Sequence, residues 1–212
     1  MKAPPVLRGG LGARLALLGG GVTLFGAGIV LMLESKLGLA PWDVLNQGLS
    51  RHSPLSFGEA NLVISLAIVV LAWRLGAPIG VGTITNAVGI SVTIIVLTAI
   101  HAVGRLAHEP LAVRIVLLAA GISLIGAGSG FYLGAALGAG PRDSLMVVGA
   151  RRTRFRIGAV RATLELVALL AGLALGGTAG AGTVAFVVLI GPSVEGSFWL
   201  LSRSPLALPS TA

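Results

Sequence analysis

The 212-residue chain is 55% hydrophobic and only 10% charged, whereas soluble domains carry about 25% charged residues. A soluble fold could not bury this much apolar surface, so the composition predicts an all-α, polytopic membrane protein, a single integral membrane domain over residues 1–212. The net charge of +8 comes from basic residues in the gaps between apolar runs, which favours topology signals over nucleic-acid binding. The absence of cysteine excludes disulfides, thiol redox chemistry and cysteine-bound metal.

Three long helices and one short helix are predicted in the first half of the chain. The apolar runs at 15–33, 58–75 and 83–103 are each long enough to cross a bilayer, and the first is too long for a signal peptide. Between the first two runs, Pro41 and Asp43 mark the start of a short helix that ends near residue 50. Proline fits the first helical turn, and a carboxylate is favoured at the positive end of the helix dipole.

The same pattern restarts one hundred positions later without a gap. Residues 11–94 align with residues 111–194, with roughly 25 of 84 pairs identical, and Pro141 and Asp143 repeat the start of the short helix. Small residues inflate this identity, but the matched proline, aspartate and arginine positions do not follow from composition. We therefore predict two tandem homologous repeats, 11–94 and 111–194, each with three long transmembrane helices plus one short helix, as in many transporter folds.

The relative orientation of the two repeats depends on the short helices. If the short helices re-enter on the same side, the repeats are inverted; if they span the membrane, the repeats are parallel. With a cytoplasmic N-terminus, the inverted topology leaves 11 of the 15 Lys and Arg residues inside and the parallel topology leaves 12. The positive-inside rule therefore does not separate the two topologies. Arginines kept in both copies, such as Arg14 and Arg114, favour the parallel arrangement, because matched basic residues are then on the same side. Against it, a helix over residues 41–50 would rise only about 15 Å, half the thickness of a bilayer. We prefer the parallel arrangement, and residues 151–156 are cytoplasmic in either.

The repeated prolines and aspartates are the first candidate site. Asp43 and Asp143, each following Pro41 or Pro141, could place two carboxylates and two helix N-termini at one midplane cavity that binds substrate or a coupling ion. The alternative is that both aspartates are helix caps that satisfy backbone N–H groups at the membrane surface.

Three further polar residues lie inside apolar runs. Glu165 follows Arg161 by four positions on one helix face, a pair that is costly in lipid and therefore predicts a cavity-facing proton carrier. The alternative is a structural pair near the surface, with Arg161 reaching the interface. Asn86 could line the same cavity or bond to a neighbouring helix, and Glu195 fits a cavity or a rim equally well.

No sequence motif indicates catalysis. The two Gly-x-Gly-Thr turns at 80–83 and 180–183 predict helix starts rather than nucleotide-binding loops, and the three histidines lack metal-ligand spacing. The sequence therefore predicts no enzyme, no cofactor and no metal site.

The motifs together resemble the YitT/YczE/YyaS family of bacterial multipass membrane proteins, in particular its YczE-like branch. The resemblance rests on residues 38–45, 47–50, 55–58 and 80–83, and on residues 138–145, 151–153 and 180–183 of the second copy. It covers about residues 11–194. It implies an integral inner-membrane protein without the soluble C-terminal domain of YitT, with relatives linked to export of small molecules, and it implies no particular binding residue.

The leading functional hypothesis is a secondary transporter or exporter of a small organic molecule. Its partners would be membrane lipids and an unknown small-molecule substrate, with no nucleic acid and with homo-oligomers left open. The expected location is the bacterial inner (cell) membrane, multi-pass, with a cytoplasmic N-terminus. The alternative is a non-transporting scaffold or accessory subunit of a biosynthetic or export system, in which the acids only cap helices.

Overall fold

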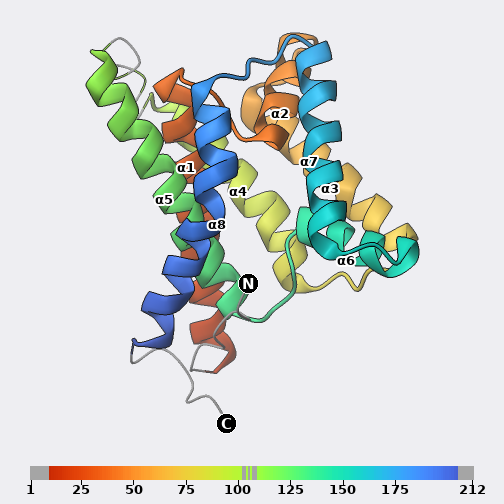
Figure 1. Ribbon diagram of the computed structural model, residues 1–212. Coiled ribbons are helices and arrows are strands. Elements are labelled where there is room, and N and C mark those ends of the chain that lie inside the picture. The colour runs from red at the N-terminus through yellow and green to blue at the C-terminus, as the bar shows by residue number, and fades with distance from the viewer. Residues whose placement is uncertain (1–9, 102–103, 105, 107–108, 205–212) are drawn as a thin grey trace.

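In the described part of the chain, the fold consists of six long helices and two short ones (Figure 1). The computed structural model describes residues 10–101, 104, 106 and 109–204. Within that part of the chain the six long helices are apolar enough to cross a membrane, as predicted. They are α1 (Leu11–Ser35), α3 (Phe57–Arg74), α4 (Val81–Ala99), α5 (Leu111–Gly134), α7 (Ile157–Ala174) and α8 (Ala181–Ser202), and the short helices are α2 (Pro41–Arg51) and α6 (Pro141–Thr153).

Local sequence explains where helices α2, α4, α6 and α8 begin. Pro41 and Pro141 occupy the first positions of α2 and α6, as predicted, because proline pre-sets the helical φ angle. The predicted starts at the Gly-x-Gly-Thr turns are also confirmed: the backbone N–H of Gly80 donates to the Thr83 hydroxyl at 3.3 Å. Helix α4 ends at residue 99 rather than 103, and residues 102 and 103 at the end of the predicted run lie outside the described residues.

The centre of the fold is an antiparallel crossing of α1 and α5. A Cβ atom added at Gly28 would lie 2.6 Å from the carbonyl oxygen of Gly121, and one added at Gly128 would lie 2.6 Å from that of Gly21. Glycine is therefore needed for the two backbones to approach this closely. The 100-residue alignment pairs α1 with α5, and parallel copies would run these helices in the same direction, so our preference for the parallel arrangement is wrong.

Two arginines tie the ends of this crossing together. Arg14 donates to the carbonyl of Ala135 at 2.7 Å, at the end of α5, and Arg114 donates to that of Ser35 at 2.8 Å, at the end of α1. These carbonyls have no partner within their own helix, so the arginines satisfy them. Each arginine thus serves the opposite helix, which explains its presence at both positions without placing both on one side.

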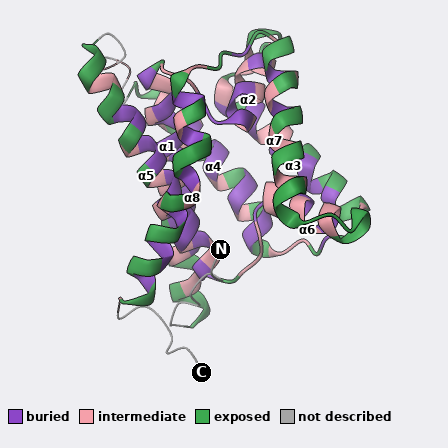
Figure 2. Cartoon of the chain, in the orientation of Figure 1, coloured by how far each residue is buried: buried purple, intermediate pink, exposed green. Residues whose placement is uncertain are grey.

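The other helices surround the crossing in matching positions. Helix α4 packs on α1 and α8 packs on α5, while α2 packs on α7 and α6 packs on α3. Figure 1 shows α2 near one end of the molecule and α6 near the other. Figure 2 shows that α7 is mostly exposed. It buries two residues, whereas the matching helix α3 buries seven, so the two sides of the fold differ in how tightly they are packed.

Candidate functional site

The first turns of the two short helices face each other at a partly buried ion pair. An Nη2 of Arg142 lies 3.5 Å from Oδ1 of Asp43, and the two side chains are 27% and 2% exposed. Because the prolines begin both helices, Asp43 is the third residue of α2 and Arg142 the second residue of α6. The pair therefore links the two short helices across a sequence separation of 99 residues.

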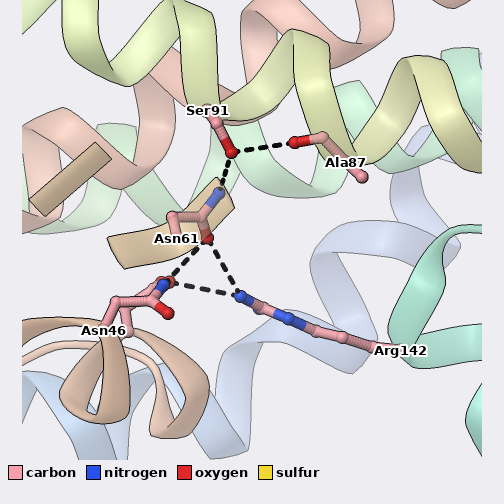
Figure 3. Close-up of polar contacts among 6 residues, drawn as sticks. Asn46, Asn61, Ala87, Ser91 and Arg142 are labelled. Atoms are coloured by element: carbon pink, nitrogen blue, oxygen red, sulfur yellow. Dashed lines mark hydrogen bonds and ion pairs between the residues drawn. The ribbon is translucent and has the colours of Figure 1, made fainter. Parts of the chain in front are cut away.

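A chain of polar side chains extends from this pair into α3 and α4 (Figure 3). The amide nitrogen of Asn46 donates to Asp43 Oδ1 at 3.0 Å and to Asn61 Oδ1 at 2.8 Å. The amide of Asn61 donates to the Ser91 hydroxyl at 2.7 Å, and Arg142 also reaches Asn61 Oδ1 at 3.4 Å. Four helices, α2, α3, α4 and α6, thus share one buried network.

Two features leave this network incompletely satisfied. The side-chain carbonyl Oδ1 of Asn46 is buried without a hydrogen-bond partner, although buried polar atoms are nearly always paired. The guanidinium of Arg142 lies 5.3 Å from the ring centroid of Trp42, a cation–π contact that holds the arginine without using all its donors. The site therefore retains acceptor and donor capacity for a further group.

The second aspartate has different partners. The hydroxyl of Tyr132 on α5 donates to Oδ2 of Asp143, and Asn86 lies beside them: a Cβ atom added at Gly140 would lie 3.1 Å from Asn86 Oδ1 and 3.3 Å from Asp143 Oδ2. The amide nitrogen of Asn86 is buried and unpaired. Both aspartates thus lie in polar clusters at the starts of the short helices, with Asp43 buried and Asp143 half-buried.

The predicted pair on α7 also forms. Arg161 Nε donates to Glu165 Oε1 at 2.9 Å, with side chains 39% and 22% exposed. Helix α7 packs on α6, the helix whose first turn carries Asp143, whereas Glu195 is exposed on α8 and takes no part in either cluster.

The cap alternative does not describe the aspartate side chains. Neither carboxylate accepts a hydrogen bond from a backbone N–H among the described residues; their bonds go to Asn46 and Arg142 in one case and Tyr132 in the other. The helix-start prediction itself is confirmed, since Pro41 and Pro141 begin the helices.

Sequence reasoning missed most of the partners. Arg142 lies in the repeated motif itself, where an arginine after the helix-starting proline was a detectable signal. Asn46 lies one turn after Asp43 on α2. Asn61 and Ser91 lie on α3 and α4, whose faces differ too little in hydrophobicity for the periodicity to show which one is buried. Tyr132 gave no signal, because its match in the first copy is Met32.

Two surface pockets lie at the turns that precede the short helices. One, of about 430 Å³, is lined by Gly38, Gln47, Arg51 and Thr178 among others. The other, of about 230 Å³, is lined by residues that include Gly138 and Arg151. Gly38 and Gly138 have φ angles of +133° and +130°, a conformation that side chains disfavour, so glycine is required at these turns.

The described residues include no group of three or more histidines, aspartates or glutamates placed to hold a metal ion. What the two clusters offer instead is hydrogen bonding and paired charge. They can therefore bind a polar group or hold a proton within an otherwise apolar helix bundle.

Comparison with known proteins gives a consistent set of relatives. Residues 12–197 match the sequence model of DUF6198, described as a family of unknown function. The chain is 37% identical over 187 residues to an uncharacterized protein of Haemophilus influenzae, covering 87% of this chain and 83% of that one. It is 34% identical over 178 residues to the uncharacterized membrane protein YczE of Bacillus subtilis (81% and 79% covered), and 27% identical over 176 residues to YyaS of the same species (81% and 85%). No solved structure matches the chain.

Proposed function

The chain belongs to the DUF6198 family of YczE-like membrane proteins, and on that premise we propose that it is a secondary transporter that exports a small organic molecule across the bacterial inner membrane. The observation that carries the proposal is the contact between Asp43 and Arg142, at the first turns of two different short helices. A buried ion pair is costly in an apolar bundle, and ionisable groups within membrane helices commonly mark substrate or ion pathways.

The proposed architecture is two inverted repeats with re-entrant short helices. Helices α2 and α6 have 11 and 13 residues, which gives rises of about 16 and 20 Å, short of the ~30 Å hydrocarbon core. The antiparallel crossing of α1 with α5 and the reciprocal arginine contacts support a two-fold relation between the halves. Many transporters place discontinuous helices at such a repeat interface, with helix N-termini directed at the substrate.

The same arrangement supports a cytoplasmic N-terminus. In the inverted topology that orientation leaves 11 of the 15 lysines and arginines on the cytoplasmic side, including the arginine-rich connection before α7. The majority is what the positive-inside rule expects of an inner-membrane protein.

The chemistry of the site fits binding and release of a polar substrate. The two N-termini each supply about half a positive charge, and the side chains supply Asp43, Asp143 and Glu165 against Arg142 and Arg161. These charges nearly cancel, so a substrate or proton that exchanges with one of the pairs would change the charge balance of the site. Glu165 and Asp143 are the candidate proton carriers, and no catalytic step is proposed.

The proposal is tested by transport currents. The purified chain, reconstituted in liposomes on a solid-supported membrane, is exposed to single amino acids, amines and carboxylic acids under a pH gradient. We expect a current with at least one compound class, reduced roughly tenfold in Asp43→Asn and Arg142→Gln, a loss of about 1.4 kcal/mol of interaction. Arg152→Gln is the matched control, because Arg152 lies on the same helix but bonds the Leu75 carbonyl.

The opposite result would favour the accessory-subunit alternative. If no compound class gives a current, or if the Asp43 and Arg142 variants carry the same current as the Arg152 variant, the pair has no part in transport.

A further inference from the structure

The two halves of the molecule differ in one helix pair. Helix α3 packs along α4, whereas the matching helices α7 and α8 make no comparable contact. In Figure 1, α7 and α8 diverge from their connection. Helix α7 buries only Ala168 and Gly172, while α3 buries seven residues. One pair is therefore closed and the other open.

The closed pair is held by a glycine contact and one hydrogen bond. A Cβ atom added at Gly58 would lie 2.5 Å from Cγ1 of Ile95 and 3.0 Å from its backbone nitrogen, so α3 and α4 touch where Gly58 lacks a side chain. One turn further along α3, Asn61 donates to Ser91 at 2.7 Å.

The open pair has matching positions with nothing packed on them. A Cβ atom added at Gly158 or Gly191 would meet no atom within 4 Å. In the alignment, Glu195 holds the position of Ile95 and Arg161 that of Asn61. Glu195 is exposed in the second half of α8, where a membrane helix would present a carboxylate to lipid, a costly placement without a partner.

We propose that Glu195 is the partner of Arg161 in a second conformation, in which α7 closes on α8 as α3 now closes on α4. This inference rests on the proposed inverted-repeat transporter. If α7 packs on α8 as α3 packs on α4, Gly158 lies against Glu195, and Arg161 is one turn away on the same face of α7. Arg161 then exchanges its bond to Glu165 for one to Glu195.

The exchange gives Glu195 a positioning role in transport. With the N-terminus in the cytoplasm, the divergent ends of α7 and α8 face the cytoplasm, so the present conformation keeps this helix pair apart on the cytoplasmic side. Closing α7 on α8 and releasing α3 from α4 converts it to the outward-open state, as rocking of inverted repeats does. The ion pair stabilises the closed contact only in that second state, which is how such a residue shifts a conformational equilibrium.

Spin-label distances in liposomes test the proposal on the full chain. Labels are placed at Thr163→Cys and Gly196→Cys, and both positions are exposed in this structure. The matching residues Val63 and Val96 are 47% and 49% exposed in the closed pair. Neither label therefore enters the contact between the two helices. The reference is Val63→Cys with Val96→Cys. We expect the 163–196 pair to show a long distance and a second, short one equal to the main 63–96 distance.

Two variants assign the short distance. Glu195→Gln should lower its population about threefold, the size of a typical polar contact between membrane helices. Gly158→Val should remove it, while leaving the present conformation and its stability unchanged because space at Gly158 is open. A single 163–196 distance, or a short distance unaffected by Glu195→Gln, overturns the proposal.

Transport currents separate this outcome from failure of the proposed function. If the current persists while only one 163–196 distance is seen, the transporter proposal stands and the role of Glu195 is refuted. If both distances are seen and respond to Glu195→Gln without any current, the conformational exchange stands and the transporter proposal is refuted.

Discussion

Removing Arg142 should destabilise the protein more than neutralising Asp43. Arg142→Ala removes the cation that pairs with the Asp43 carboxylate, and this carboxylate is only 2% exposed. Asp43→Asn instead leaves an arginine that is 27% exposed and can reach water. Breaking a fully buried ion pair costs about 3–5 kcal/mol. Because the contact is a single one at 3.5 Å and one partner is partly exposed, we expect about 2–3 kcal/mol for Arg142→Ala and about 1 kcal/mol for Asp43→Asn.

The double variant isolates the interaction. Once Asp43 is neutral, removing Arg142 no longer leaves a buried charge, so the double variant should cost about 1–2 kcal/mol less than the sum of the single variants. The assay is reversible unfolding in mixed micelles with increasing SDS, followed by circular dichroism, with Arg152→Ala as the control. A larger loss in Asp43→Asn than in Arg142→Ala, or additive losses, would refute this account of the pair.

Three further predictions follow from particular contacts. Gly28→Leu should destabilise the protein by about 1–3 kcal/mol or more, since a Cβ atom there would lie 2.6 Å from a carbonyl oxygen of α5. The control is Gly20→Leu, at a position with open space, which should leave the unfolding midpoint unchanged in the same micelle assay. Arg114→Gln should lower the free energy of unfolding by about 1–2 kcal/mol, because two carbonyls at the end of α1 lose their hydrogen-bond donor. An unchanged unfolding midpoint would show that water replaces the arginine as donor. Tyr132→Phe removes the only side-chain donor to Asp143 in the described structure and should lower the transport current without unfolding the chain. A current equal to that of the wild type would show that this hydrogen bond has no part in the transport cycle.

The sequence was sufficient to predict the helices and their order. Long apolar runs identify the six long helices, and the Pro41 and Pro141 motifs locate both short ones to within a few residues. These signals are local: hydrophobic length and proline chemistry act within one segment. They carry no information on which segments meet.

The wrong preference for parallel copies shows where local reasoning stops. Arg14 and Arg114 looked alike because each does the same task, yet each performs it on the other half of the chain. If a two-fold axis relates the two halves of the chain, these reciprocal contacts require an arginine at both matching positions. This holds even when the two arginines lie on opposite sides of the membrane. The sequence contains the repeated arginine but not the identity of its partner.

The candidate site was predicted only in part for the same reason. Asp43 and Asp143 stood out as charges in apolar surroundings, but their partners depend on packing between helices. In the sequence Arg142 is only one of the 15 lysines and arginines that bear on topology, whereas the structure places it against Asp43. Asn61 and Ser91 lie on helices whose faces differ little in hydrophobicity, so only tertiary structure shows that they face each other.

The most direct test of the account is the side of the membrane on which the two short helices end. Single cysteines are placed at Ser53 and Thr153, the matching positions at the ends of α2 and α6. They are exposed in intact cells to a membrane-impermeant thiol reagent, and the cysteine-free chain provides the background. Inverted repeats with re-entrant short helices and a cytoplasmic N-terminus predict labelling of the cysteine at 53 and protection of the one at 153, with labelling of 153 only after the cells are opened. The same behaviour at both positions would contradict the inverted arrangement, and with it the meeting of Asp43 and Arg142 between two opposed short helices.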